Sequence, residues 1–228
     1  MSKSLQNDTL KTSGIVLRRT NYGEADRIIN LITPVGKVSA IAKGARREKS
    51  KLAGGIEMFL LSDYVIRFSK SDMGIVASAK MVEHFEKIMS DYDKMELAGV
   101  ILKKISAVDA HESRKYFEIT LQCLRALNND VSLVVIESWF WLNMMEAMGE
   151  GVNLYRDTNG DKLQAGVNYK WDVGNSAFIM DTNGEYGTNE IKMLRLMLTM
   201  ELAAVARVKT DAVLLDRVLR LSRIAAGL

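Results

Sequence analysis

The spacing of apolar residues changes once along this 228-residue chain, near residue 81, and this change limits the folds that it can adopt. Before it, apolar and polar residues alternate in short runs separated by turn-forming residues, which is the pattern of β-strands. After it, apolar residues recur every three or four positions, which is the pattern of amphipathic helices. The sequence therefore predicts an α+β fold with a β-rich domain followed by a helical one.

About five short strands are expected in the first part, at residues 11–20, 25–33, 38–43, 56–69 and 75–79. Turn signals stand between them, including Asn21-Tyr22-Gly23, the only proline at Pro34, and a hairpin turn at Ser71-Asp72. Short strands at this spacing are typical of a small barrel. The longer spacing of a parallel sheet with crossover helices is absent, which argues against a nucleotide-binding sheet.

Helical stripes follow, beginning with the apolar series from Ala98 to Val108 and the series from Phe117 to Leu127. Residues 131–148 are apolar nearly all round, which indicates the central helix of a helical domain. Residues 152–187 lose this period and contain Asp-Thr-Asn-Gly twice, at 157–160 and 181–184, so we expect a small β excursion with hairpin turns. Helical patterning returns from Ile191 and continues to the C-terminus.

Positive charge is concentrated in the first part of the chain. Residues 1–80 hold 14 Lys and Arg against 7 Asp and Glu, whereas residues 81–228 hold 17 against 21. Residues 43–51, hereafter the basic loop, carry five cations and a single acid, Glu48. Such a loop is either a solvated surface or a binding surface for a polyanion, and further cations in the same predicted barrel favour nucleic acid.

A barrel that presents cations can follow a phosphate backbone without distinguishing base sequence. The predicted DNA contacts are Arg18, Arg19, Arg27, Lys37, Lys43, Arg46, Arg47, Lys49 and Lys51. Tyr22, in a predicted turn, is the candidate for base stacking, because aromatic residues within the strands suit a core position at least as well. Residues 44–50 resemble a phosphate loop but place a carboxylate where phosphate would lie, which excludes nucleotide hydrolysis.

Residue types that carry catalysis or hold metals are scarce. Cys123 is the only cysteine, and its apolar neighbours indicate an inert thiol on a buried helix face. With two separated histidines, His84 and His111, we expect no structural zinc, no other cofactor and no catalytic residue. No apolar run is long enough to span a membrane and the start lacks the apolar core of a signal peptide, so a cytoplasmic protein is expected.

The same N-terminal residues resemble a known family, the DNA repair protein RecO, which is a recombination mediator. The resemblance rests on a series of motifs in the family's order over about the first 85 residues: Gly14-Ile15-Val16-Leu17-Arg18, Tyr22-Gly23-Glu24-Ala25-Asp26-Arg27-Ile28, Gly36-Lys37, Ala42-Lys43-Gly44-Ala45-Arg46-Arg47, Lys49-Ser50 and the segment from Gly54 to Phe59.

The resemblance implies an oligonucleotide/oligosaccharide-binding (OB) barrel at residues 1–85, an α-helical domain at residues 86–228, and a non-enzymatic role. It implies binding of single- and double-stranded DNA, strand annealing, and loading of recombinase together with a RecR-like protein. Many family members carry a four-cysteine zinc element where residues 154–187 stand. This segment has no cysteine, so metal binding is not carried over.

The resemblance also implies that the helical domain binds the acidic C-terminal tail of single-stranded-DNA-binding protein. The cations available for this contact on the predicted helices are Lys103, Lys104, Arg114, Lys115 and Arg125. The sequence thus predicts a RecO-like, metal-free mediator of recombinational repair. The alternative is a non-enzymatic protein adaptor whose basic loop is only solvated, and the salt dependence of DNA binding distinguishes the two.

Overall fold

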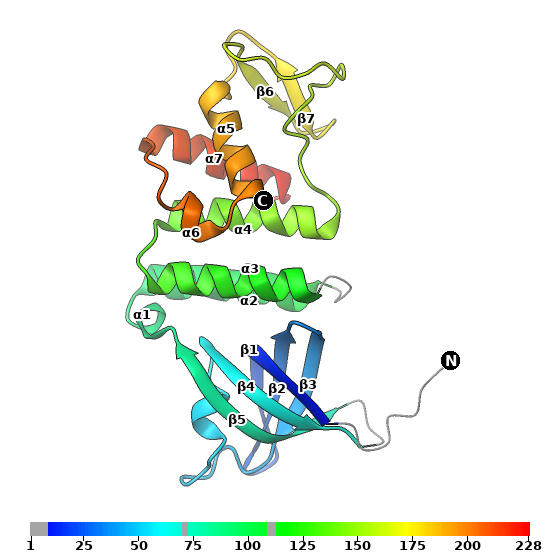
Figure 1. Cartoon of the computed structure of the whole chain (residues 1–228), viewed down its shortest axis with the longest axis vertical. Helices are drawn as coiled ribbons and strands as arrows, with labels where there is room; N and C mark the ends of the chain where they lie inside the picture. The colour runs from blue at the N-terminus through cyan, green and yellow to red at the C-terminus, as the bar shows by residue number, and fades with distance from the viewer. Residues whose placement is uncertain (1–8, 70–72, 109–112) are drawn as a thin grey trace, which may run out of the picture. The chain divides into compact units, whose positions relative to one another are not determined.

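The computed structural model describes residues 9–69, 73–108 and 113–228, and the chain divides into two compact units, residues 1–128 and 129–228. The described part of the first unit holds a β-barrel and helices, and that of the second holds helices and a small two-stranded sheet (Figure 1). The expected α+β fold, with strands first and helices afterwards, is confirmed.

The barrel is closed by five strands: β1 (Thr9–Tyr22), β2 (Asp26–Thr33), β3 (Gly36–Ala42), β4 (Leu60–Arg67) and β5 (Gly74–His84). Their order around the barrel is β1-β2-β3-β5-β4, and only the pairing of β3 with β5 is parallel. Each strand expected from the sequence is present, although β4 begins at Leu60 and not at Ile56, and β5 continues past its predicted end at Ala79. The predicted turn residues Ser71 and Asp72 lie outside the described residues.

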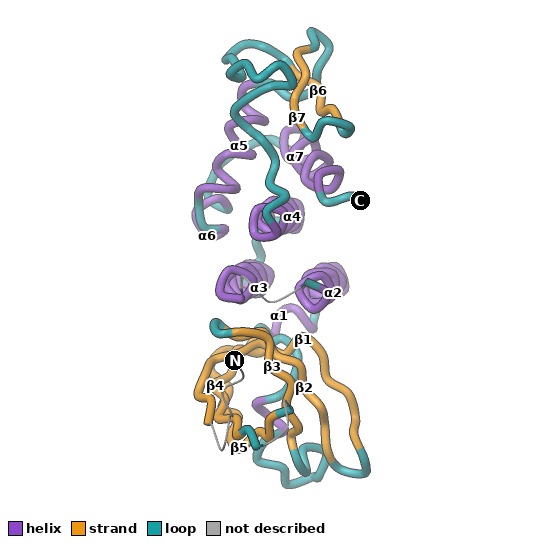
Figure 2. Tube along the Cα trace, turned by 90° about the vertical axis from the view of Figure 1, so that its right-hand side faces the viewer, coloured by secondary structure: helices purple, strands orange, loops and turns teal. Residues whose placement is uncertain are grey.

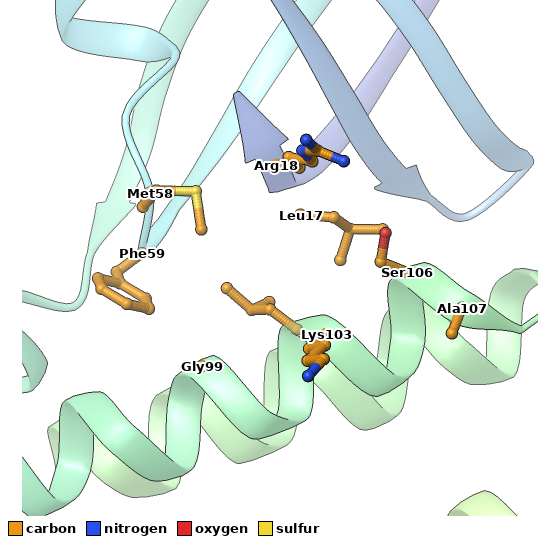
Figure 3. Close-up of a pocket in the computed structure, with 9 residues that line it drawn as sticks. Leu17, Arg18, Met58, Phe59, Gly99, Lys103, Ser106 and Ala107 are labelled. Atoms are coloured by element: carbon orange, nitrogen blue, oxygen red, sulfur yellow. The ribbon is translucent and has the colours of Figure 1, made fainter. Parts of the chain in front are cut away.

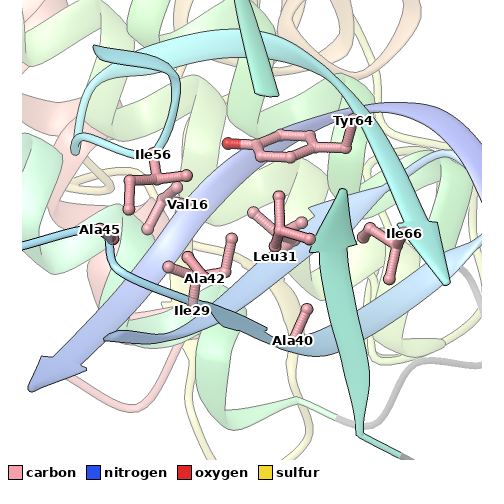
Figure 4. Packing of buried hydrophobic residues seen from close by; sticks show 10 residues of the cluster. Val16, Ile29, Leu31, Ala40, Ala42, Ala45, Ile56, Tyr64 and Ile66 are labelled. Atoms are coloured by element: carbon pink, nitrogen blue, oxygen red, sulfur yellow. The ribbon is translucent and has the colours of Figure 1, made fainter. Parts of the chain in front are cut away.

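Alternation along these strands builds the barrel interior. Val16, Ile29, Leu31 and Ile66 are fully or almost fully buried and point into one cluster with Tyr64 (Figure 4). Each such aliphatic side chain contributes roughly 1.5–3 kcal/mol of transfer free energy when it leaves water. The apolar residues that recur every second position in the sequence are therefore the ones that form this core.

A close backbone approach follows the basic loop. The short 3₁₀ helix η1 (Ala53–Gly55) lies against β5, and a Cβ atom on Gly55 would stand only 2.6 Å from the carbonyl oxygen of Ala79. The Tyr64 hydroxyl donates to the Gly55 carbonyl at 2.8 Å. Glycine at this position therefore lets the chain pass β5 closely before it enters β4.

Helices complete the first unit: α1 (Glu86–Met89), α2 (Tyr92–Ala107) and α3 (Ser113–Asn128). Figure 2 shows α2 and α3 side by side, and α2 packs on β1 while α3 packs on β1, β2 and β3. The predicted stripe from Ala98 to Ile105 is the buried face of α2. The predicted domain boundary after residue 85 coincides with the end of the barrel, whereas the compact unit extends to Asn128 because these helices pack on the strands.

The second unit is organised around α4 (Leu133–Met148), which packs against α5 (Thr188–Thr199), α6 (Leu202–Val205) and α7 (Ala212–Ala225). Trp139, Phe140 and Trp141 are all buried, as expected for a helix that is apolar on every side. Gly149, at φ +79°, provides the left-handed residue that ends α4. The predicted central helix is confirmed.

The segment at residues 152–187 forms the expected β excursion, with β6 (Tyr169–Asp172) paired to β7 (Ala177–Met180). The first Asp-Thr-Asn-Gly segment forms the predicted type of turn, because Arg156 and Lys162 on its two sides form an antiparallel bridge. The prediction needs a correction for the second segment, since β6 and β7 are joined through residues 173–176. In each of those segments the aspartate side chain organises the turn. Asp157 Oδ1 accepts from the amides of Asn159 (2.9 Å) and Asp161 (3.0 Å), and Asp181 Oδ1 accepts from the Asn183 amide at 2.8 Å.

Aromatic side chains form the interior of this segment. Phe178 is fully buried and meets the rings of Tyr169, Trp171 and Tyr186 edge-on, at centroid distances of 5.1–6.1 Å. Across the described residues, no group of three or more His, Cys, Asp or Glu side chains is placed to hold a metal ion. His84 is exposed and Cys123 is buried, and His111 lies outside the described residues.

We expect Gly55→Ala to lower the free energy of unfolding by roughly 1–3 kcal/mol, because the added methyl group overlaps the backbone of Ala79. Urea denaturation measures this change. Gly54→Ala is the matched control, since a Cβ atom there meets nothing within 4 Å. Equal effects of the two substitutions would show that the close approach to β5 does not limit stability.

We also expect the turn at Asp181 to loosen in acid. A hydrogen bond from Lys170 Nζ at 2.6 Å and one from the Asn183 amide hold the pKa of Asp181 below its ordinary value. This stabilisation is therefore complete above the unfolded pKa of about 3.9 and is lost as the pH falls through the lower folded value. The protection factor of the Asn183 amide, measured by hydrogen exchange, should fall in that range. In Asp181→Asn this pH step should disappear.

Candidate nucleic-acid interface

The basic loop leaves the end of β3 and is fastened to the turn between β1 and β2. The Gly44 amide donates to Asp26 Oδ1 at 2.7 Å, and the Arg46 amide donates to the Ala25 carbonyl at 2.9 Å. Gly44 has φ +64°, which glycine adopts without strain, and Ala45 is buried in the barrel core. The loop backbone is therefore held at the end of the barrel away from α2 and α3 (Figure 1).

The cations of the loop are presented on this fixed backbone. Lys43, Arg47, Lys49 and Lys51 are exposed to solvent. Arg46 is exposed as well, and its Nη1 also donates to carbonyl groups of the β1–β2 turn at 3.2 and 3.3 Å. Arg46 therefore both contributes charge and helps to fasten the loop.

Two further predicted contacts lie on the outer side of β1. Tyr22 is 52% exposed and pairs across the strands with Asp26, which binds the loop, so the structure brings this ring and the loop to the same end of the barrel. Arg18 is also exposed, but it stands farther along β1 and lines a pocket beside α2. Tyr22 thus lies near the cations of the loop, and its role in base stacking stays a prediction.

Arg19 and Arg27 both form ion pairs with Glu57, a pairing that the sequence did not predict. Arg27 Nη1 donates to Glu57 Oε1 at 2.9 Å, and Arg19 Nη1 donates to the other oxygen, Oε2. Burial, and then the nearby charge of Arg27, lowers the pKa of Arg19. One signal was available in the sequence, since Glu57 is the only acid between Glu48 and Asp63.

Lys37 is placed elsewhere. It lies at the opposite end of β3 from the basic loop, where its Nζ donates to the Ser106 carbonyl at 2.9 Å and to the Val108 carbonyl. These groups belong to the C-terminal end of α2, where the helix dipole favours a positive charge. The structure thus gives Lys37 a role in stability that the sequence did not indicate.

A pocket of about 340 Å³ opens between β1 and α2 (Figure 3). Leu17, Met58 and Phe59 form an apolar lining, and the cations Arg18 and Lys103 also line the pocket. Phe59 has φ +59°, a left-handed conformation that is unusual for a bulky residue. The pocket is thus an apolar slot with two cationic residues among those that line it.

The other predicted partner-binding cations do not line this slot. Arg125 forms a two-pronged ion pair with Glu83, at 2.8 and 2.9 Å, and Arg114 pairs with Glu118 on the same helix at 3.5 Å. Lys104 is half-buried on α2, and Lys115 is exposed on α3. The structure therefore does not bring the five predicted cations together.

The barrel residues match a family of known proteins. Residues 7–85 match the family described as "Recombination protein O N terminal". The barrel is therefore similar to the N-terminal domain of RecO proteins. It contains the basic loop, the turn that fastens it, and Tyr22.

Several curated proteins named DNA repair protein RecO are similar to a longer part of the chain. The protein of Acetivibrio thermocellus is 35% identical over 144 residues, which are 61% of this chain and 57% of that protein. The protein of Roseiflexus sp. (strain RS-1) is 29% identical over 147 residues, 64% of this chain and 52% of that protein. The match to the RecO protein of Dehalococcoides mccartyi is 27% identical over 215 residues and covers 90% of this chain and 85% of that protein.

These matches confirm the resemblance to the RecO family. With the first two of these RecO proteins the chain aligns over only just more than half of their length. The family model itself matches the barrel, at residues 7–85. No helix in the described ranges is long and apolar enough to cross a membrane.

We expect Lys37→Met to reduce stability and to leave the charge presented by the basic loop unchanged. Loss of a cation at the end of α2 should lower the free energy of unfolding by roughly 0.3–1 kcal/mol. Thermal denaturation measures this loss, and titration with DNA at several salt concentrations should give the same slope as the parent protein. A flatter slope would instead assign Lys37 to a phosphate contact.

Proposed function

We propose that this protein is a DNA-binding mediator of recombinational repair, which anneals complementary strands and helps to load recombinase on single-stranded DNA. The observation that carries this proposal is the basic loop, whose exposed cations stand on a backbone fastened to the β1–β2 turn. The likeness to proteins named DNA repair protein RecO supports it.

The physical basis is charge neutralisation. Cations that contact phosphates release condensed counterions, and this gain does not depend on base sequence. When phosphates of two strands are neutralised together, their repulsion falls and base pairing can proceed. Annealing by this route needs no catalytic residue, so the role we propose is non-enzymatic.

Removal of the exposed loop cations tests the proposal. We expect Arg47→Ala, Lys49→Ala and Lys51→Ala, combined in one variant, to weaken binding to all DNA sequences alike and to slow annealing. Each lost contact should flatten the plot of log K against log salt by roughly 0.7 for single strands or 0.9 for duplex. Stability should change little, since exposed substitutions are usually within about 0.5 kcal/mol.

The matched control removes the same charge from other faces of the barrel. Lys11, Arg67 and Lys80 are exposed on β1, β4 and β5, and their triple alanine variant should keep the salt slope of the parent protein. If both triple variants bind DNA as the parent does, the loop is only a solvated surface. The adaptor function would then be the better account.

A protein partner is the second part of the proposal. We infer that the slot between β1 and α2 binds the acidic C-terminal tail of a single-stranded-DNA-binding protein. Apolar groups of the tail would contact Leu17 and Met58, and its acids would contact Arg18 and Lys103. A RecR-like protein is the other partner that we propose, on the family likeness alone.

Fluorescence anisotropy with a labelled tail peptide tests the slot. We expect Lys103→Glu to weaken peptide binding by roughly tenfold, the effect of losing one charge-assisted contact. Lys115→Glu makes the same charge change on α3, away from the slot, and should leave the affinity unchanged. Equal weakening by both variants would show that the peptide responds only to net charge.

A further inference from the structure

A single carboxylate bridges two arginines at the end of the barrel that carries the basic loop. Glu57 offers Oε1 to Arg27 at 2.9 Å and Oε2 to Arg19. Arg27 pairs across the strands with Ala42, the residue that precedes the basic loop. A polyanion on the loop would therefore lie near this arginine pair.

The two arginines are close because of the strand register. Arg19 pairs with Ile29, two residues from Arg27 on β2, so the two guanidinium groups project on the same face of neighbouring strands. Two guanidinium groups that contact the same carboxylate are close enough to repel each other, and their pairing with Glu57 offsets that repulsion. Without an anion between them, the arrangement would be unfavourable.

The backbone that carries Glu57 is firmly held. Ile56 is fully buried in the barrel core, and Gly55 before it approaches Ala79 and accepts the Tyr64 hydroxyl. The side chain of Glu57 is nevertheless 41% exposed, whereas those of Arg19 and Arg27 are 32% and 23% exposed. The carboxylate can therefore rotate into solvent while the segment and the arginines stay in place.

A carboxylate and a phosphodiester present the same features to arginine: a negative charge and two oxygens that accept N–H groups in parallel. Each guanidinium carries five N–H donors, and Glu57 takes up only one nitrogen of each in the contacts described. The pair thus has the geometry of a phosphate site that is filled by a side chain of the same chain.

We propose that Arg19 and Arg27 form a phosphate-binding site for the DNA backbone and that Glu57 is its intramolecular competitor. This proposal rests on the proposed DNA binding and adds a control to it. A phosphate that enters the site displaces Glu57, which rotates into solvent. Glu57 therefore lowers the affinity for DNA and sets how much phosphate charge must be present before the arginine pair is engaged.

Glu57→Gln tests the competition directly. Its amide is neutral and holds the arginines weakly, so single-stranded DNA should bind about fivefold more tightly at moderate salt, the effect of releasing two partly exposed ion pairs. The engaged pair should also steepen the plot of log K against log salt by about 0.7. Glu57→Asp keeps the negative charge but shortens the side chain by one methylene, so its carboxylate should hold the arginines less well. We therefore expect a smaller gain in DNA affinity, and a change in net charge cannot explain it.

Two controls separate this site from a general charge effect. Glu83→Gln removes an acid that also bridges to an arginine, Arg125, and it should not change DNA affinity. Arg27→Ala added to Glu57→Gln should abolish the gain. Thermal denaturation of every variant verifies that the fold is kept.

The outcomes are distinct. An unchanged affinity in both Glu57 variants, or an equal gain in Glu83→Gln, would overturn the competitor while leaving DNA binding by the loop intact. A gain that persists after Arg27→Ala would overturn the assignment of the arginine pair. If the parent protein shows no salt-dependent DNA binding at all, the proposed function and this site are both refuted.

Discussion

The hydrogen bond between the Asp26 carboxylate and the Gly44 amide determines what this protein can present to a polyanion. Five cations within nine residues repel one another, and a loop with such a sequence would by itself sample many conformations. Asp26 fixes its first turn to the barrel, and the Arg46 amide fixes the next at Ala25. Because the backbone is already ordered, less conformational entropy is lost when a ligand binds.

Much of the fold could be predicted because burial determines the spacing of apolar residues. Ile29 and Leu31 stand two residues apart because every second residue of β2 faces the barrel cluster, and Ala98 and Ile101 recur at helical spacing because one face of α2 packs on the barrel. The connection between β6 and β7 was not predictable in this way. Asp157 and Asp181 bind their own downstream amides, and that local bond forms a turn whether or not a hairpin follows.

The functional side chains were predicted less completely, because their roles depend on partners that are distant in sequence. In the sequence, a lysine beside a β-turn looks the same whether its side chain binds DNA or the end of a helix. For Lys37 the structure shows the second case, because its Nζ donates to the Ser106 carbonyl at the end of α2. Arg19 and Arg27 likewise looked like free cations until Glu57 was placed between them. The sequence indicates which charges exist, whereas the fold determines which of them are already neutralised.

The segment at residues 152–187 shows how a small β element can be held together with hydrogen bonds and aromatic packing. A two-stranded sheet alone is marginal in water, so it needs an additional source of order. Here Phe178 is enclosed by three aromatic rings, and the Asp157 carboxylate accepts two backbone amides while it is itself buried. A buried carboxylate is tolerated only when such donors compensate for its lost hydration. The Asp157 carboxylate is therefore part of the interior of this segment, and the same hydrogen bonds that organise its turn contribute to its order.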